Sequence, residues 1–94
     1  MADEIAPPEP TSVPKRRLDA RVRNYRGVTM VAGGDQSFEL SETAAFVWRS
    51  LDDSRSVDDI ARLLGSEYEV DHETALADVS ELLTTLARAG VLTY

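Results

Sequence analysis

The pattern of hydrophobic and polar residues divides the chain into a front part without periodicity, a part with period two and a part with helical period. Residues 1–17 contain all 4 prolines of the chain and no regular apolar spacing. Such a composition is typical of a disordered segment, because it offers little apolar surface to bury. We therefore expect a disordered N-terminal tail over residues 1–17 and one folded domain over residues 18–94.

Three short runs at the start of the folded part predict β-strands. They are an edge strand at residues 19–22, a β-branched and apolar run at residues 28–31, and an alternating run at residues 37–40. Gly27 is available for the first turn, and the AGGD segment at residues 32–35 indicates a hairpin because glycine and aspartate adopt positive φ at low cost. We expect an antiparallel sheet, with Phe38 and Leu40 facing the core and Ser37 and Glu39 facing solvent.

From residue 41 the apolar spacing changes to threes and fours, which predicts three helices. Ser41 is expected to cap the first helix. Ser56 with Asp59 resembles a capping box for the second helix, which Gly65 should end. Residue 71 is expected to cap the third helix and residue 90 to end it. Three strands followed by three helices make an α+β architecture, and a winged helix-turn-helix contains the same elements.

Composition and charge exclude several classes of protein. The chain has no cysteine and one histidine, His72, so we expect neither a metal or other cofactor nor an enzyme. Its apolar runs are far shorter than the ~20 residues of a membrane helix, so we expect no membrane partner and a cytoplasmic location. The three acids and three bases of residues 1–17 cancel, and the net charge of −7 comes from 14 acids and 7 bases after residue 17. Nucleic acid is therefore not an expected partner.

Four segments between residues 22 and 92 carry a family resemblance. The main one is FELSETAAFVW at residues 38–48, where a strand ending in leucine leads through a polar cap into a helix with Trp48. The others are SVDDI at residues 56–60, Tyr68 with Val70, and DVSELL at residues 78–83 followed by Leu86 and by GVL at residues 90–92. In order and spacing these segments resemble the PqqD family, whose members are also called RiPP precursor-peptide recognition elements (RiPPs being ribosomally synthesised and post-translationally modified peptides).

The resemblance implies a non-catalytic peptide chaperone. Such a protein binds the leader of a ribosomally made precursor and presents it to a modifying enzyme such as a radical SAM protein, a cyclase or a leader peptidase. It also implies binding by strand addition to the third strand, beside the third helix at residues 72–89. An edge strand has unpaired backbone groups that an extended peptide can satisfy. The expected peptide-binding residues are Gln36, Ser37, Phe38, Glu39, Leu40, Leu76, Val79 and Leu83.

The apolar stripe of the third helix is wider than one contact with a sheet requires. We assign one part of it to the groove and the other to the core, and the sequence leaves open both the interchange of the two parts and a core role for all six residues. The groove set is Leu76, Val79 and Leu83, and the core set is Ala75, Leu82 and Leu86. The acids Glu39, Asp78 and Glu81 beside this groove favour a leader with Lys or Arg.

Two other classes of function stay open from the sequence. A winged-helix DNA-binding regulator shares the topology, although the net charge and the acids of the third helix oppose it. An accessory or oligomerising subunit of a larger enzyme would also use an exposed strand edge, and a homodimer is left open.

Overall fold

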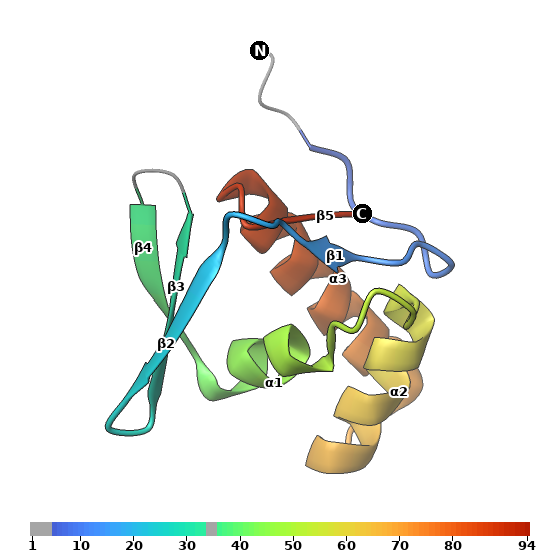
Figure 1. Ribbon diagram of the computed structural model, residues 1–94. Coiled ribbons are helices and arrows are strands. Elements are labelled where there is room, and N and C mark those ends of the chain that lie inside the picture. The colour runs from blue at the N-terminus through green and yellow to red at the C-terminus, as the bar shows by residue number, and fades with distance from the viewer. Residues whose placement is uncertain (1–4, 34–35) are drawn as a thin grey trace.

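The computed structural model describes residues 5–33 and 36–94. Its sheet of three antiparallel strands lies on one side of the molecule and its three helices on the other, which confirms the α+β architecture (Figure 1). A short two-stranded ribbon joins the front of the chain to its C-terminal end. In chain order the elements are β1 (Lys15–Arg16), β2 (Arg21–Tyr25), β3 (Val28–Gly33), β4 (Gln36–Leu40), α1 (Glu42–Ser50), α2 (Val57–Tyr68), α3 (His72–Arg88) and β5 (Leu92–Thr93).

The central strand of the sheet is β3, which pairs antiparallel with β2 on one side and with β4 on the other. Arg26 and Gly27 connect β2 to β3 with φ angles of 52° and 81°, as a two-residue type I′ hairpin turn requires. This confirms the turn expected at Gly27. The second expected turn includes residues 34 and 35, which lie outside the described residues; the flanking Gly33 and Gln36 are opposite each other.

The helices begin at the caps that the sequence predicts. The side chain of Ser41 accepts a hydrogen bond from the Ala44 amide at 3.1 Å, and Ser56 and Asp59 form a reciprocal capping box. At the start of α3, hydrogen bonds from the Thr74 side chain and amide lower the pKa of Asp71. This contribution to stability is present above the ordinary carboxyl pKa and is lost as the pH falls through the lowered value.

Gly65 does not end α2, and the prediction that it would is wrong. The helix continues to Tyr68, and Glu69 takes the left-handed capping conformation with φ 57°. A Cβ atom at position 65 would lie 2.9 Å from the Val70 carbonyl oxygen and 3.7 Å from Ala75 Cβ. Glycine is therefore needed at this position because the α2–α3 connection and α3 pass close to the backbone of α2.

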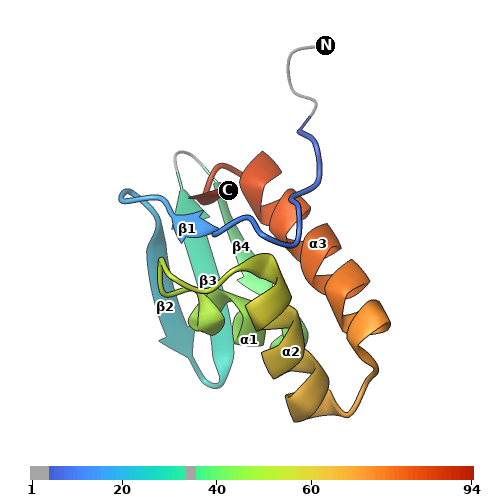
Figure 2. The same cartoon turned by 90° about the vertical axis from the view of Figure 1, so that its right-hand side faces the viewer.

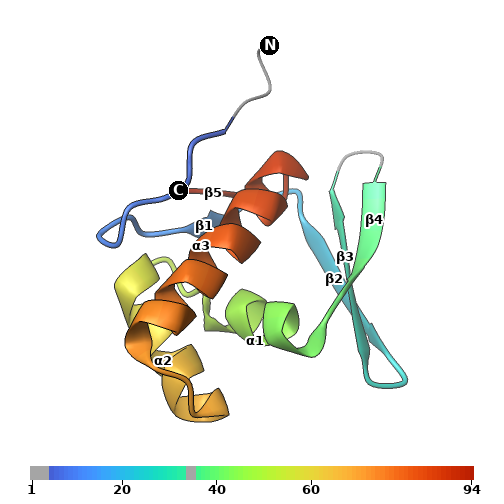
Figure 3. The same cartoon turned by 180° about the vertical axis from the view of Figure 1, so that it is seen from behind.

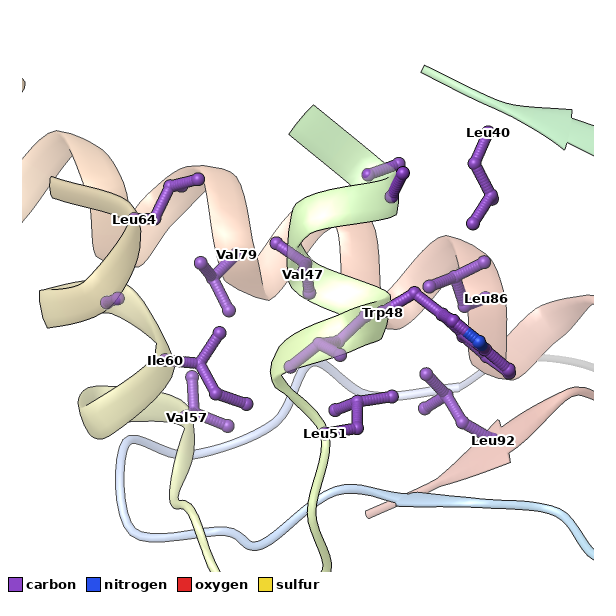
Figure 4. Close-up of a cluster of buried hydrophobic side chains, with 14 of the residues drawn as sticks. Leu40, Val47, Trp48, Leu51, Val57, Ile60, Leu64, Val79, Leu86 and Leu92 are labelled. Carbon is purple, nitrogen blue, oxygen red and sulfur yellow. The ribbon is translucent and has the colours of Figure 1, made fainter. Parts of the chain in front are cut away.

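One hydrophobic core joins the helices to the inner face of the sheet (Figure 4). Trp48 of α1 is 2% exposed and lies among Leu51, Leu86 and Leu92. Ile60 and other residues of α2 pack with α3, while Leu40 brings the end of β4 into the same cluster. Each side chain of this size contributes about 1.5–3 kcal/mol when it is fully buried.

Residues 5–17 lie against the helices, which differs from the disordered tail expected over residues 1–17; residues 1–4 are outside the described part. The carbonyls of Pro10 and Ser12 accept hydrogen bonds from Asp58 and Val57 at 3.0 and 2.8 Å. Amides in the first turn of a helix have no partner within the helix, so a proline-rich segment can be held by its carbonyl groups alone. Pro14 is fully buried, and β1 then pairs with β5.

Arg16 of β1 fixes this segment to α1. Its guanidinium group lies 5.1 Å from the centre of the Trp48 ring and donates a hydrogen bond of 2.6 Å to the Trp48 carbonyl. Figure 2 shows the segment crossing the top of α2 on its way to β1, on the side away from β4. Residues 5–17 therefore lie on the helices, and within the described residues the front of the chain leaves the β4 edge uncovered.

Within the described ranges, no helix has both the length and the apolar character to cross a membrane.

Candidate functional site

The outer edge of β4 has no strand partner within the described part of the chain. The sheet order is β2-β3-β4, so β2 and β4 are its two edges, and the β1–β5 ribbon is a separate sheet. Seen from behind in Figure 3, α3 lies with the C-terminal end of the chain on one side and β4 on the other. The edge that the sequence predicts for peptide binding is thus free and next to the helix expected to form the groove.

The register shows which backbone groups of β4 point outward. Residues that flank a two-residue hairpin form a hydrogen-bonded pair, so Tyr25 and Val28 are such a pair, and along β3 the residues alternate between bonding β2 and bonding β4. Val31 therefore turns its backbone groups to Phe38 of β4. It follows that the amide and carbonyl groups of Ser37 and Glu39 point away from the sheet.

The side chains of β4 alternate as predicted. Phe38 is half-buried and Leu40 is 7% exposed, whereas Ser37 and Glu39 are exposed on the opposite face. Gln36, at the start of the strand, is exposed. An added strand would therefore place every second side chain beside Phe38, between the sheet and α3.

The two flanks of α3 face different neighbours. Ala87 lines a cavity with Ile5 and Tyr94, so the flank that carries Leu76 and Ala87 faces the N-terminal segment and the C-terminal end of the chain. At 100° per residue, Asp78, Leu82 and Thr85 lie on the opposite flank. Because α3 lies between the C-terminal end of the chain and β4 (Figure 3), we infer that this second flank is the one nearer to β4.

This arrangement corrects the groove-facing residues expected on the third helix. Val79 and Leu83 are both 0% exposed and belong to the core, so neither offers surface to a peptide. Leu76 is half-buried on the flank away from β4. Leu82, which we had assigned to the core, is half-buried on the flank that faces the β4 edge. The apolar spacing of the third helix predicts which residues share a flank, but it does not predict which element each flank faces.

The surroundings of the β4 edge are acidic. Asp78 and Glu81 are exposed on α3, and Glu39 is exposed on β4. Beyond the end of β4 a shallow depression of about 420 Å³ is lined by Glu39, Glu42 and Arg49 among other residues. Two carboxylates against one guanidinium make this depression negative, which favours a cationic side chain.

Two other groups singled out in the sequence have structural partners. His72 lies at the start of α3 with its Nε2 atom 2.7 Å from Asp58 Oδ1, and Asp58 also pairs with Arg62 at 3.1 Å. These contacts tie the first turn of α3 to that of α2. Tyr68 packs edge-on against Phe46. Partial burial raises the pKa of the Tyr68 hydroxyl, and the negative charges of Glu42 and Glu67 raise it further.

A three-stranded sheet, three helices and a free strand edge beside α3 define a small domain of the winged-helix class. The sequence profile of the family described as Coenzyme PQQ synthesis protein D (PqqD) matches residues 26–92. The chain belongs to this family. No curated protein matches it.

Solved structures agree with this assignment. The PqqD part of Methylobacterium extorquens PqqCD, described as a functional and stand-alone RiPP recognition element, is 27% identical with a TM-score of 0.79, over 92% of this chain and 94% of that one. A lasso peptide synthetase B1 in complex with its leader peptide is 28% identical with a TM-score of 0.77, over 88% of this chain and 100% of that one. TbiB1 in complex with the TbiA(beta) leader peptide shares the fold at 20% identity and a TM-score of 0.74, over 83% and 93% of the two chains.

Proposed function

We propose that this protein is a RiPP recognition element, which binds the leader of a ribosomally made precursor peptide as a fourth strand on β4. The observation that carries the proposal is the free β4 edge, with the backbone groups of Ser37 and Glu39 directed outward beside α3. The similarity to a leader-bound lasso peptide synthetase B1 supports the same function. The partner is a modifying enzyme to which the leader is presented, of the radical SAM, cyclase or leader peptidase class.

The contact surface that we propose has a backbone part and a side-chain part. Residues 36–40 supply the hydrogen-bonding edge, and Phe38 and Leu82 supply the apolar contact for side chains that point inward. Backbone pairing gives affinity to any extended peptide, while these alternate contacts select the sequence. We therefore keep Gln36 to Leu40 from the site expected on the sequence. On α3, Leu82 replaces Leu76, Val79 and Leu83.

The protein acts by binding and not by catalysis in this proposal. Its single imidazole, that of His72, is paired with Asp58, which links the first turn of α3 to the first turn of α2. That pair lies at the start of α3, whereas the proposed leader site lies along the sheet edge. Ribosomal precursors are available in the cytoplasm, which is the location we propose for the complex.

Acidic groups beside the edge set the chemistry of the leader. Asp78 stands on the β4-facing flank of α3, and Glu39 stands on the outer face of β4. Successive side chains of an extended leader point to opposite faces. We therefore expect apolar side chains on the inward face of the leader, and Lys or Arg on its outward face or beside it, where they meet these acids.

The test is a titration of the ¹⁵N-labelled protein with the leader of the precursor encoded beside its gene. We expect saturable 1:1 binding, with the largest amide shifts at Ser37 and Glu39 and with new protection of both amides from hydrogen exchange. A scrambled leader of the same composition is the control. Shifts confined to β2 or to α2, or no binding at concentrations that would detect a Kd of ~1 mM, would contradict the proposal.

A further inference from the structure

The basic residues of this acidic protein are concentrated in one short part of the chain. Six of the 10 lysines and arginines lie between residues 15 and 26, whereas 13 of the 17 acids lie after residue 26. Within this basic part, Arg21, Arg23 and Arg26 belong to β2 and its turn. One edge of the sheet is therefore basic, while the other edge lies beside acidic helices.

The register places these basic side chains on one face of the sheet. Arg21 is opposite Ala32, Arg23 is opposite Met30, and residues opposite each other in a sheet share a face. Their neighbours in β3, Thr29, Val31 and Gly33, are buried against the core, so the arginines lie on the face turned away from the helices. Figure 2 shows the helices on one side of the sheet only.

This outer face has a shallow depression with an apolar floor. It has a volume of about 370 Å³ and is lined by Arg21, Arg23, Met30, Ala32 and Ser37. Met30 and Ala32 are half-buried and form the floor on the neighbouring strand, directly opposite the two arginines. A half-exposed apolar floor with a basic rim is the pattern of a protein contact surface.

The fold does not use these charges internally. All five residues of β2 are exposed, and among residues 5–33 and 36–94 no ion pair involves Arg21, Arg23 or Arg26. The Arg26 guanidinium lies 5.4 Å from the ring centre of Tyr25, which is 67% exposed. Arginine, tyrosine and methionine are among the residue types that are enriched in protein interfaces.

We propose that the outer face of the sheet, formed by Arg21, Arg23, Tyr25 and Met30, is a second docking surface, which takes an acidic segment of a protein partner. The partner is a short acidic protein segment rather than a nucleic acid, because a duplex has a much higher density of negative charge and is repelled more strongly at long range by the net charge of −7. Glu39 also stands on this face, opposite Met30, and it would meet the phosphates of a bound duplex. Ser37 borders both this depression and the proposed leader edge, but Arg21, Arg23, Tyr25 and Met30 lie outside the leader edge, so the two surfaces can be tested separately.

In the test, the full ¹⁵N-labelled chain is titrated with an alternating Glu–Ala peptide as probe. Binding is measured from the amide shifts at low and at physiological salt. We expect shifts at Arg21, Arg23, Met30 and Ala32, little response to a Lys–Ala peptide, and weaker binding at the higher salt. The double variant Arg21→Glu with Arg23→Glu should weaken binding at least about tenfold. The variant Arg62→Glu with Arg88→Glu makes the same change of net charge on the helices and should weaken it less than about threefold.

Several results would overturn this proposal. Equal losses in the two double variants would mean that the peptide responds to net charge alone. Tighter binding of a short DNA duplex than of the Glu–Ala peptide would assign the face to nucleic acid, and a dimer in sedimentation that the Arg21→Glu, Arg23→Glu variant abolishes would assign it to a second copy. Binding of the leader in the same double variant separates the two proposals, because it should be unchanged whichever way the acidic-peptide test falls.

Discussion

The two edges of the sheet have the same backbone chemistry and different surroundings. By the same register argument, Val22 and Asn24 of β2 point their amide and carbonyl groups outward just as Ser37 and Glu39 of β4 do. The β2 edge is exposed on both faces and is basic. The β4 edge, by contrast, has the core on its inner face and the Leu82 flank of α3 beside it.

This difference teaches that a free strand edge alone does not define a peptide site. Backbone groups give an extended peptide affinity at either edge, but only the β4 edge provides an apolar surface for alternate side chains. The β2 edge offers charge and an exposed aromatic ring, which fit a partner that lies on the face of the sheet.

The largest effect should come from removing an outward amide at each edge in turn. Ser37→Pro removes such an amide and adds a ring against the incoming strand, so we expect leader affinity to fall at least about tenfold. Val22→Pro makes the same change on β2 and should alter affinity less than about twofold. Isothermal titration of both variants measures the difference, with thermal unfolding to verify that each is folded.

A proline at Phe38 is not an equivalent test, because the Phe38 amide is directed to β3 and its loss would damage the sheet itself. If Ser37→Pro and Val22→Pro weakened leader binding equally, the β4 edge would have no special role and the comparison would fail.

A smaller effect is expected from the side chains of α3. Leu82→Ala removes a half-buried leucine from the flank that faces β4, and we expect affinity for the leader to fall about three- to tenfold. Leu76→Ala removes the same side chain from the other flank and should leave affinity within about twofold. Because both residues also pack on the core, affinity is to be compared at a temperature where both variants are fully folded. A greater loss for Leu76→Ala would show that the flanks have been assigned in reverse.

The smallest effect is electrostatic. Glu39→Gln with Asp78→Asn should weaken the binding of a basic leader about two- to fivefold and flatten its salt dependence, as expected for exposed charges. Glu67→Gln with Glu73→Gln changes net charge equally at exposed positions away from the β4-facing flank and serves as the control. Unchanged affinity and unchanged salt dependence in the Glu39→Gln, Asp78→Asn variant would contradict the proposed preference for a basic leader.

Local signals in the sequence predicted most of the fold correctly. The caps at Ser41 and Ser56 and the glycine turn at residue 27 act over three or four residues, so their chemistry is readable without the tertiary structure. Gly65 misled the same reasoning because its role is a close approach of residues 70 and 75, which no local pattern reports. The contacts of the proline-rich front were not readable from the sequence either, since its anchors are carbonyl groups, which every residue type has.

The sequence by itself determined the order of strands and helices and the excess of acid in the helices, because these follow from short-range periodicity and composition. The family resemblance implied a binding edge at residues 36–40, and the sheet order β2-β3-β4 placed that strand at an edge. Only the tertiary structure decided that Leu82 rather than Val79 or Leu83 faces that edge, and that Arg21 and Arg23 share a face with Met30. The physical reason is that a helical stripe or a strand alternation fixes the angles between side chains of one element. The neighbour that each side meets depends on how the elements pack.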